Sequence, residues 1–157
     1  MAEKGKKAET VVATNRKAFH DYNIEERYEA GMALQGTEVK AIREGLVNLR
    51  DSFARVDGTE VILHNCHIDP YTKAAAQYNH DPLRERRLLA HRREIRKLEA
   101  ETKERGTTLI PLAIYFKGSH AKVEIGVAKG KQHHDKRQSI KKKEMDRDVR
   151  RAMSHRQ

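Results

Sequence analysis

The feature that most restricts the fold is a pair of apolar–polar alternations, each of which reverses at a glycine. The first runs through SFARVDGTEVILHNCHI, where Asp57-Gly58 supplies the positive φ angles of a tight turn between two β-rich arms. The arm from Val61 to Ile68 is long for a strand, so we expect it to curve. This stretch predicts an antiparallel β-hairpin.

The second alternation, TLIPLAIYFKGSHAKVEIGVA, reverses at Gly118. On its first arm, Leu112, Ile114 and Phe116 lie two residues apart, which predicts that they share one face of a strand. The second arm alternates in the same way. This stretch predicts a second antiparallel hairpin.

A further strand is predicted upstream in HDYNIEERYEAG, with Tyr22, Ile24, Tyr28 and Ala30 on one side. Short helices are predicted in GTEVKAIREG and RREIRKLEAETKERG, and NHDPLRERR between them is predicted to be a turn region. No strand–helix–strand unit recurs, so a parallel sheet is not expected. We therefore predict a mainly β fold, a closed or nearly closed antiparallel barrel with short peripheral helices, because closure removes unpaired strand edges.

Composition is consistent with one modest core and a wet periphery. Of 157 residues, 37% are hydrophobic and 36% are charged. No apolar run approaches the roughly 18 residues that a membrane span requires, and the first residues lack a signal-peptide pattern. A single cysteine, Cys66, favours a reducing cytoplasm. We expect a disordered segment at 1–14, the barrel domain at 15–131 and a basic tail at 132–157.

The charge is distributed unevenly. The net charge is +10, of which +7 lies in residues 129–157, so the body is nearly balanced. A basic tail on a nearly neutral body indicates a polyanionic partner. Nucleic acid is the first candidate and a membrane surface is the rival.

The tail has helical spacing. Met145, Val149, Ala152 and Met153 form one apolar stripe. The nearly opposite basic stripe consists of Lys143, Arg147, Arg150 and Arg151. The apolar stripe is too small to offset the entropy lost on ordering this segment, about 1–2 kcal/mol per residue. We therefore predict that the free tail is mostly disordered and becomes helical against a partner.

Two other clusters are candidate chemical sites. HNCH places His64 and Cys66 on one strand face and His67 on the other, without the second ligand pair that zinc normally requires. QHHD offers His133, His134 and Asp135 as an acid–base or metal cluster, but no pocket-forming segment surrounds it. We expect neither metal nor cofactor, and no catalytic residues.

Several segments, in order, resemble the SmpB family, the SsrA-binding proteins of bacterial trans-translation. They are NRKAFHDYNIEERYEAG, ALQGTEVKAIREG, LVNLRDSFARV, HNCHIDPY, HDPLRERRLLAHRREI, IPLAIYFKGSHAKVEIGVAKGK and HDKRQSIK. The resemblance implies an OB-fold-like barrel that binds the tRNA-like domain of transfer-messenger RNA. It also implies delivery of that RNA to stalled ribosomes, where the tail occupies the decoding centre and the empty mRNA channel of the small subunit. It implies no enzymatic activity and a cytoplasmic, monomeric protein.

The resemblance also implies residue roles. RNA contacts are implied for Asn15, Arg16, Lys17, His20, Glu29, Lys40, Lys129 and Lys131. Contacts in the decoding centre are implied for Gly130, His134, Asp135, Lys136 and Arg137, where adjacency to DKR favours His134 over His133. Contacts in the mRNA channel are implied for Ile140, Lys141, Lys143, Met145, Arg147, Arg150, Arg151 and Met153. Met145 stands where many relatives carry Trp.

Two alternatives stay open. One is a general ribosome- or tRNA-binding barrel factor without a dedicated RNA. The other is a small histidine-dependent nuclease that uses His133, His134 and Asp135.

Overall fold

The structure, a computed structural model, describes the backbone of residues 9–131 and 133–154 and the side chains of residues 9–131 and 140–153. The strands are β1 (Glu9–Thr14), β2 (Tyr22–Met32), β3 (Val47–Asn48), β4 (Phe53–Asp57), β5 (Glu60–His64), β6 (His67–Ile68), β7 (Arg86–Leu89), β8 (Thr107–Lys117) and β9 (His120–Gly130). The helices are α1 (Arg16–Asp21), α2 (Gly36–Arg43), the 3₁₀ turn η1 (Ala76–Tyr78), α3 (Arg92–Thr102) and α4 (His133–Ser154).

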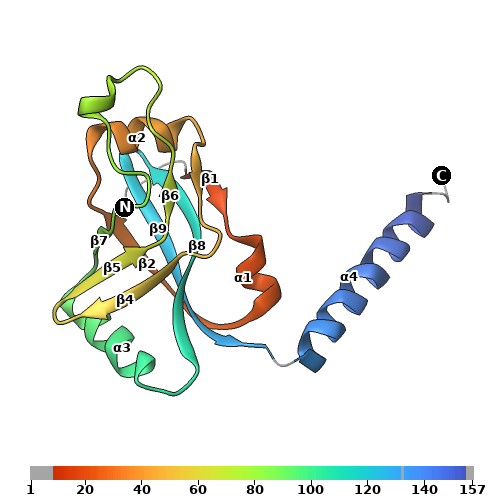
Figure 1. Ribbon diagram of the computed structural model, residues 1–157. Coiled ribbons are helices and arrows are strands. Elements are labelled where there is room, and N and C mark those ends of the chain that lie inside the picture. The colour runs from red at the N-terminus through yellow and green to blue at the C-terminus, as the bar shows by residue number, and fades with distance from the viewer. Residues whose placement is uncertain (1–8, 132, 155–157) are drawn as a thin grey trace, which may run out of the picture.

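Six strands close into an antiparallel barrel (Figure 1). The order is β8-β4-β5-β7-β2-β9, and β9 returns to pair with β8, while β1 extends the sheet from the free edge of β8. A small second sheet pairs β3 with β6. The predicted antiparallel barrel with short peripheral helices is therefore confirmed.

Both predicted hairpins form, and both turn on a glycine followed by one residue. β4 pairs with β5 from Asp57 opposite Glu60, so the turn residues are Gly58 and Thr59, one position later than predicted. Gly58 has φ +60°, and Gly118 in the β8–β9 turn has φ +61°. A positive φ at the first turn residue is typical of a II′ hairpin, whose twist matches that of its strands.

Two β-bulges divide the apolar residues between two cores. In β2 the register with β9 shifts between Ile24 and Glu26, and in β8 it shifts between Pro111 and Ala113. A bulge inserts one residue and so reverses which side chains face inward. The predictions of one continuous face along each strand are therefore wrong.

The first core lies inside the barrel and includes Ala30, Ile114, Phe116, Val123 and Ile125. The second lies outside the barrel wall, beneath α1. It consists of Ala18, Ile110, Leu112 and Ala128, with Tyr22, Ile24 and Phe53 packed against them. The bulges thus allow β2, β8 and β9 to hold α1 on their outer surface.

Other local predictions need correction. Residues Glu9–Thr14 form β1 and pair with β8, so disorder was the wrong expectation for them; residues 1–8 lie outside the described residues. The arm beyond Val61 breaks at Asn65, which has φ +58°, and does not continue as one curved strand. The predicted turn region before α3 ends in strand β7, which pairs with β5 and β2.

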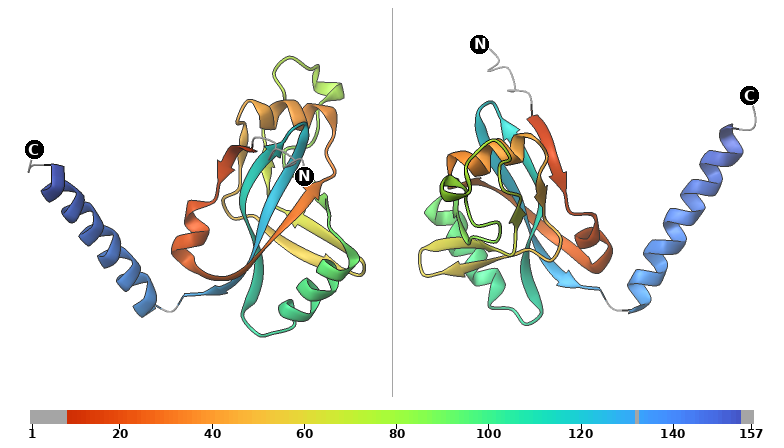
Figure 2. Two further views of the ribbon diagram at one scale, coloured as in Figure 1. Left: turned by 180° about the vertical axis from the view of Figure 1, so that it is seen from behind. Right: turned by 45° about the horizontal axis from the view of Figure 1, so that its top comes forward.

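The tail is a helix. α4 extends away from the barrel beyond the end of β9 (Figure 2). The segment contains no Gly or Pro from residue 133 onward and is rich in Lys and Arg, which both have high helix propensity. This differs from the expectation that the free tail is mostly disordered. Because α4 stands off from the barrel, its stability depends on local propensity more than on packing.

Candidate nucleic-acid interface

The N-terminal end of α1 carries cations at one end of the barrel. Arg16 and Lys17 are exposed. Lys17 Nζ lies 2.9 Å from Asp51 Oδ1, and this hydrogen bond lowers the pKa of the Asp51 carboxyl. Within the described residues, the Arg16 guanidinium makes no hydrogen bond or ion pair, so its charge is available to a ligand. His20 lies in the same helix, with Nδ1 2.9 Å from Asp21 Oδ1.

Asn15 is a structural residue. Its side chain is buried, and Oδ1 accepts a hydrogen bond from the Ala18 amide as the N-cap of α1. Nδ2 donates to the carbonyl oxygens of Leu49 at 3.3 Å and Pro111 at 3.0 Å. Because each polar atom of the amide already has a partner, the structure argues against the implied RNA contact. Asn15 instead fixes α1 against the barrel.

Glu29 lies near the middle of β2 on the outer surface. Its Oε2 accepts hydrogen bonds from Tyr115 and from Lys117, the latter at 2.8 Å. These hydrogen bonds, Lys117 first, hold the pKa of Glu29 below its ordinary value, so the carboxylate is ionised and can only accept. Within the described residues, Oε1 has no hydrogen-bond partner, so it is available as an acceptor for base amines or ribose hydroxyls.

A groove of about 620 Å³ begins at Glu29 and runs between β2, β7 and the start of α3. Its lining includes Gly31, Leu89, His91 and Lys122. The sequence predictions did not include Tyr115, Lys117 or this groove. Tyr115 and Lys117 alternate along β8 with Ile114 and Phe116 of the first core, and this period of two assigns them to the outer face of the strand, where Tyr115 is nevertheless only 7% exposed.

Lys40 lies at the opposite end of the barrel from α1. It is exposed on α2, and its Nζ lies over the Tyr71 ring at 5.4 Å from the ring centroid. α1 precedes and α2 follows β2, whose eleven residues span roughly 35 Å at about 3.3 Å per residue. The implied RNA contacts therefore do not form one patch. They occupy both ends of the barrel, with Glu29 between them.

The chain leaves the barrel beside α1. Lys129 pairs with Glu104 at 3.2 Å and Glu25 at 3.5 Å, and the first of these contacts raises the Lys129 pKa, so it is fully charged. Lys131 Nζ donates to the Phe19 carbonyl oxygen at 3.1 Å. Around Gly130 there is open space where a Cβ would lie. Lys131 thus joins the cations of α1, and Lys129, which is paired with two acids, lies at the same end of the barrel.

The tail presents its side chains to solvent from residue 140 onward. Ile140 is 45% exposed, Met145 67% and Met153 69%. The basic residues Lys141, Lys143, Arg147, Arg150 and Arg151 are exposed as well. The side chains of His134, Asp135, Lys136 and Arg137 lie outside the described residues, as does that of His133. Neither stripe of α4 therefore packs on the barrel over residues 140–153.

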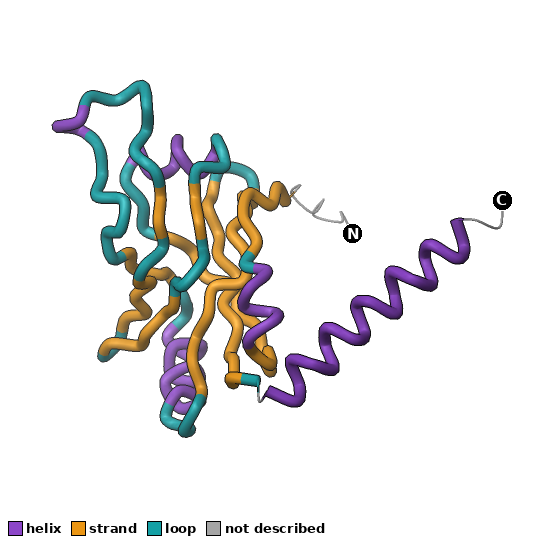
Figure 3. The backbone as a smooth tube through the Cα atoms, turned by 45° about the vertical axis from the view of Figure 1, so that its right-hand side comes forward, coloured by secondary structure: helices purple, strands orange, loops and turns teal. Residues whose placement is uncertain are grey.

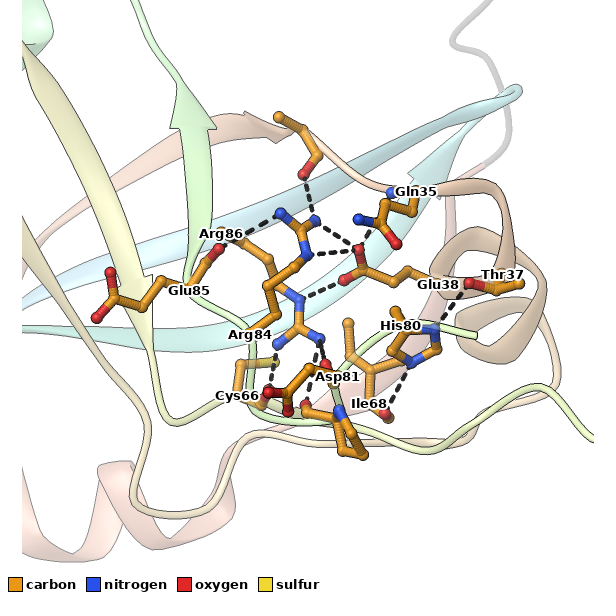
Figure 4. A network of polar contacts seen from close by, with 12 residues as sticks. Gln35, Thr37, Glu38, Cys66, Ile68, His80, Asp81, Arg84, Glu85 and Arg86 are labelled. Carbon is orange, nitrogen blue, oxygen red and sulfur yellow. Dashed lines mark hydrogen bonds and ion pairs between the residues drawn. The ribbon is translucent and has the colours of Figure 1, made fainter. Parts of the chain in front are cut away.

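A buried ionic network fixes α2 to the chain between β6 and β7 (Figure 4). Glu38 and Arg86 are completely buried, and Arg86 Nε donates to Glu38 Oε2. Arg84 Nε donates to Glu38 Oε1 at 3.0 Å. Burial alone would raise the pKa of Glu38, but the hydrogen bonds from Arg86 and Arg84 outweigh it and hold the pKa below its ordinary value. The sequence predictions missed this network.

The His and Cys residues of the HNCH segment make contacts other than metal coordination. The His64 ring stacks on Phe53 with centroids 5.0 Å apart, and His67 Nδ1 lies 3.1 Å from Asp69 Oδ1. Burial raises the pKa of the Cys66 thiol to about 11, so it is not a thiolate at neutral pH. In the part of the chain that the structure describes, no three His, Cys, Asp or Glu side chains converge as metal ligands. None of the described helices is both long and apolar enough to pass through a bilayer.

A closed antiparallel barrel with basic ends and a projecting basic helix defines a β-barrel protein of the polyanion-binding class. Comparison with known proteins is more specific. The chain belongs to the SmpB family, whose profile, described as "SmpB protein", matches residues 12–155. The match therefore includes both the barrel and α4.

Relatives and a solved structure agree with this assignment. The chain is 60% identical over 147 residues to the SsrA-binding protein of Geobacillus thermodenitrificans, with 94% of each chain covered. It is 55% identical to that of Listeria monocytogenes over 94% of this chain and 95% of the relative. A chain from "tmRNA-SmpB: a journey to the center of the bacterial ribosome" superposes with TM-score 0.67 at 45% identity, covering 83% of this chain and 94% of that one. These names describe an RNA-binding protein, and the predicted family is confirmed.

Proposed function

We propose that this protein binds the tRNA-like domain of transfer-messenger RNA and carries it to stalled ribosomes for trans-translation. The observation that carries the proposal is the extent of the family match, which includes both the barrel and the projecting α4. An adaptor requires two binding parts, one for its RNA and one for the ribosome. The barrel and α4 supply two separate surfaces for these partners.

In this proposal the barrel holds the RNA through phosphate and ribose contacts. Arg16, Lys17, Lys129 and Lys131 neutralise phosphates at the α1 end, with His20 beside them. Glu29 accepts hydrogen bonds from the RNA, and Lys40 contacts a phosphate at the other end. Asn15 acts indirectly, by holding α1 in place.

The tail reads the absence of message. Gly130, His134, Asp135, Lys136 and Arg137 lie in the decoding centre in this proposal, where His134 stacks on a base. The residues from Ile140 to Met153 occupy the empty mRNA channel, with cations toward ribosomal RNA and the Met145–Met153 stripe toward a mildly apolar wall. A channel that already holds mRNA excludes the helix sterically.

No step of this role makes or breaks a covalent bond. We therefore propose that the protein is not an enzyme and acts as a monomer in the cytoplasm. Incubation of the RNA with the protein and magnesium or zinc tests the nuclease alternative: the RNA remains intact if the proposal is right.

The proposal is tested by competition between the tRNA-like fragment of transfer-messenger RNA and ordinary tRNA for the full-length protein, at several salt concentrations. We expect clear preference for the tRNA-like fragment, with affinity falling as salt rises. Equal affinity for both RNAs contradicts the proposal and favours the general tRNA- or ribosome-binding factor. Sequencing of RNA co-purified with the protein from cells gives a second readout.

A further inference from the structure

The chain between β6 and β7, residues 69–85, forms a loop that contains η1 and projects beyond α2 (Figures 1 and 3). We call it the η1 loop. It lies at the end of the barrel away from α1 and α4. We infer that the η1 loop is a preformed platform on which an unpaired nucleobase of the tRNA-like RNA stacks against the ring of Tyr78. The inference rests on the proposed function and adds a contact to it.

Tyr78 is available for such a contact. It is 73% exposed at the C-terminal end of η1, and its ring makes no aromatic or cation–π contact among the described residues. Aromatic side chains usually bury most of their surface, so an exposed ring on an ordered loop is informative. Exposed aromatic rings beside cations are the usual means by which proteins bind unpaired bases.

The narrow part of the loop is closed by one asparagine. Asn79 Oδ1 accepts a hydrogen bond from the Tyr71 amide at 2.9 Å, and Asn79 Nδ2 donates to the Tyr71 carbonyl oxygen at 3.0 Å. The side-chain amide thereby pairs with the backbone in the manner of a neighbouring strand. Because Asn79 follows Tyr78 directly, this pair of bonds restricts the backbone that carries the Tyr78 ring.

The base of the loop is fixed to the barrel by buried groups. His80 Nε2 donates to the Ile68 carbonyl oxygen at 2.9 Å, and His80 Nδ1 lies 2.9 Å from Thr37 Oγ1 on α2. Arg86, in the network of Figure 4, donates to the carbonyl oxygens of Pro82 at 3.2 Å and Asp81 at 3.4 Å. Ordering of this loop is therefore completed on folding, and little entropy is lost when a ligand binds it.

Two exposed lysines, Lys73 in the η1 loop and Lys40 on α2, favour RNA as the occupant. Lys40 and Lys73 are exposed, and within the described residues neither has an acidic partner. Lys40 Nζ lies over the Tyr71 ring, and the Tyr71 backbone is hydrogen-bonded to Asn79, the residue after Tyr78. The three acids of the loop each have a contact: Asp69 with His67, Asp81 Oδ1 with the Leu83 amide at 2.9 Å, and Glu85 Oε1 with His64 Nδ1 at 3.3 Å. Exposed cations on and near the loop that carries this ring match the phosphates that flank a stacked base.

The position of the loop favours the tRNA-like RNA over ribosomal RNA. α4 and the basic α1 end lie at the opposite end of β2, roughly 35 Å away at about 3.3 Å per residue. If α4 enters the small subunit, the η1 loop faces away from it, toward the RNA that the protein carries.

The test compares Tyr78→Ala with Tyr78→Phe, which keeps the ring and removes the hydroxyl. Loss of one base–aromatic stack weakens affinity for the tRNA-like fragment by about 5- to 100-fold in Tyr78→Ala, whereas Tyr78→Phe binds as the unmodified protein does. Leu83→Ala is the matched control, because Leu83 is 54% exposed on the same loop and has no ring. Thermal unfolding of all three variants verifies that each is folded.

The outcomes separate this inference from the proposed function. If the unmodified protein does not prefer the tRNA-like fragment, the proposed function fails. If it does and Tyr78→Ala binds that RNA equally well, the η1-loop inference is wrong and the proposed function stands. Loss of ribosome binding alone in Tyr78→Ala also overturns the inference, because the surface then serves a different partner. An equal loss of RNA affinity in Leu83→Ala overturns it as well, because the effect is then not specific to the Tyr78 ring.

Asn79→Ala tests the preformed geometry. Without the two bonds to Tyr71 the ring remains but is less restricted, so affinity falls less than in Tyr78→Ala. The double variant should bind no more weakly than Tyr78→Ala alone, because both changes remove the same stack. Additive losses would show that Asn79 does not act through Tyr78.

Discussion

The carboxylate of Glu38 and the guanidinium of Arg86 form an ion pair in which neither side chain has any exposed surface. Arg84 donates a hydrogen bond to the other oxygen of the Glu38 carboxylate. The remaining Arg86 donors bond to the backbone carbonyls of Cys66, Asp81 and Pro82. Burial of an unpaired charge is very unfavourable, so each member requires the others. Through this pair, α2 and β7 fix the geometry of the barrel end that carries the η1 loop.

Removal of Glu38 should therefore destabilise the protein strongly. We expect Glu38→Ala to lower the free energy of unfolding by about 3–5 kcal/mol, because Arg86 is left buried without its counter-charge. Glu60→Ala, which removes an exposed pair with Arg87, should change it by less than about 1 kcal/mol. Urea unfolding at neutral pH measures both. Similar values for the two variants would show that the buried pair is not important for stability.

Acid should weaken the protein through the same carboxylate. The hydrogen bonds that hold the pKa of Glu38 below its ordinary value of 4.5 mean that the unfolded state binds a proton first as pH falls. The stabilisation is complete above about pH 4.5 and is lost as pH falls through the lower, folded-state pKa. Glu38→Gln should lack this component, so its pH profile is flatter over that range. Parallel profiles for the two proteins would contradict this assignment.

Substitution by alanine at two glycines of β9 should affect stability differently. A Cβ on Gly126 would lie 2.9 Å from Leu112 Cδ1 and 3.1 Å from Ile24 Cγ2, so overpacking of the second core should cost about 1–3 kcal/mol. Gly130 has open space around it, and its alanine variant should retain full stability within about 1 kcal/mol. Urea unfolding tests both. Any loss of ribosome rescue in a stable Gly130→Ala protein then reports a contact with the partner.

The barrel and the tail should have separable activities. Deletion of residues 132–157 should leave binding to the free tRNA-like fragment intact and abolish peptide tagging on stalled ribosomes, because the described residues of α4 extend away from the barrel. Deletion of residues 2–8 serves as the control. Gel-shift titration and a tagging assay on a truncated message give the two readouts. If RNA affinity collapses with the tail, the proposed division is incorrect.

A peptide of residues 133–154 should be weakly helical in plain buffer. Its apolar stripe has no surface to pack on, and like charges lie four residues apart at Lys143–Arg147 and Arg147–Arg151. Circular dichroism measures the helix content, which should rise when a polyanion is added. A strongly helical peptide in buffer alone would show that α4 needs no partner.

Local sequence patterns predicted the elements whose geometry is local. The two hairpins follow from a period of two and a glycine at each turn, and α2 and α3 follow from the three-residue spacing of their apolar residues. The basic tail is equally visible, because charge is a property of composition. Family motifs then supplied the barrel type and its RNA partner, which composition alone leaves open between nucleic acid and a membrane surface.

The elements that were missed depend on distant residues. α1 has six residues, too few for a periodic signal, and its cap residue Asn15 is held by carbonyl oxygens 34 and 96 positions away. β7 contains Arg86, which no hydrophobic pattern assigns to an interior, because its burial requires Glu38 on α2. The bulges of β2 and β8 are register shifts relative to β9, so they are recognised only when the pairing of these strands with β9 is known.

The amino-acid sequence by itself determined the antiparallel hairpins, the basic charge and helical spacing of the tail, and the family, since each depends on residues close together in the chain or on motifs read in order. Only the tertiary structure decided that Asn15 is structural, that the cations occupy two ends of the barrel, and that Tyr78 stands exposed on an anchored loop. Burial and ion pairing are set by contacts between residues far apart in the chain, and a one-residue bulge changes which side chains make them.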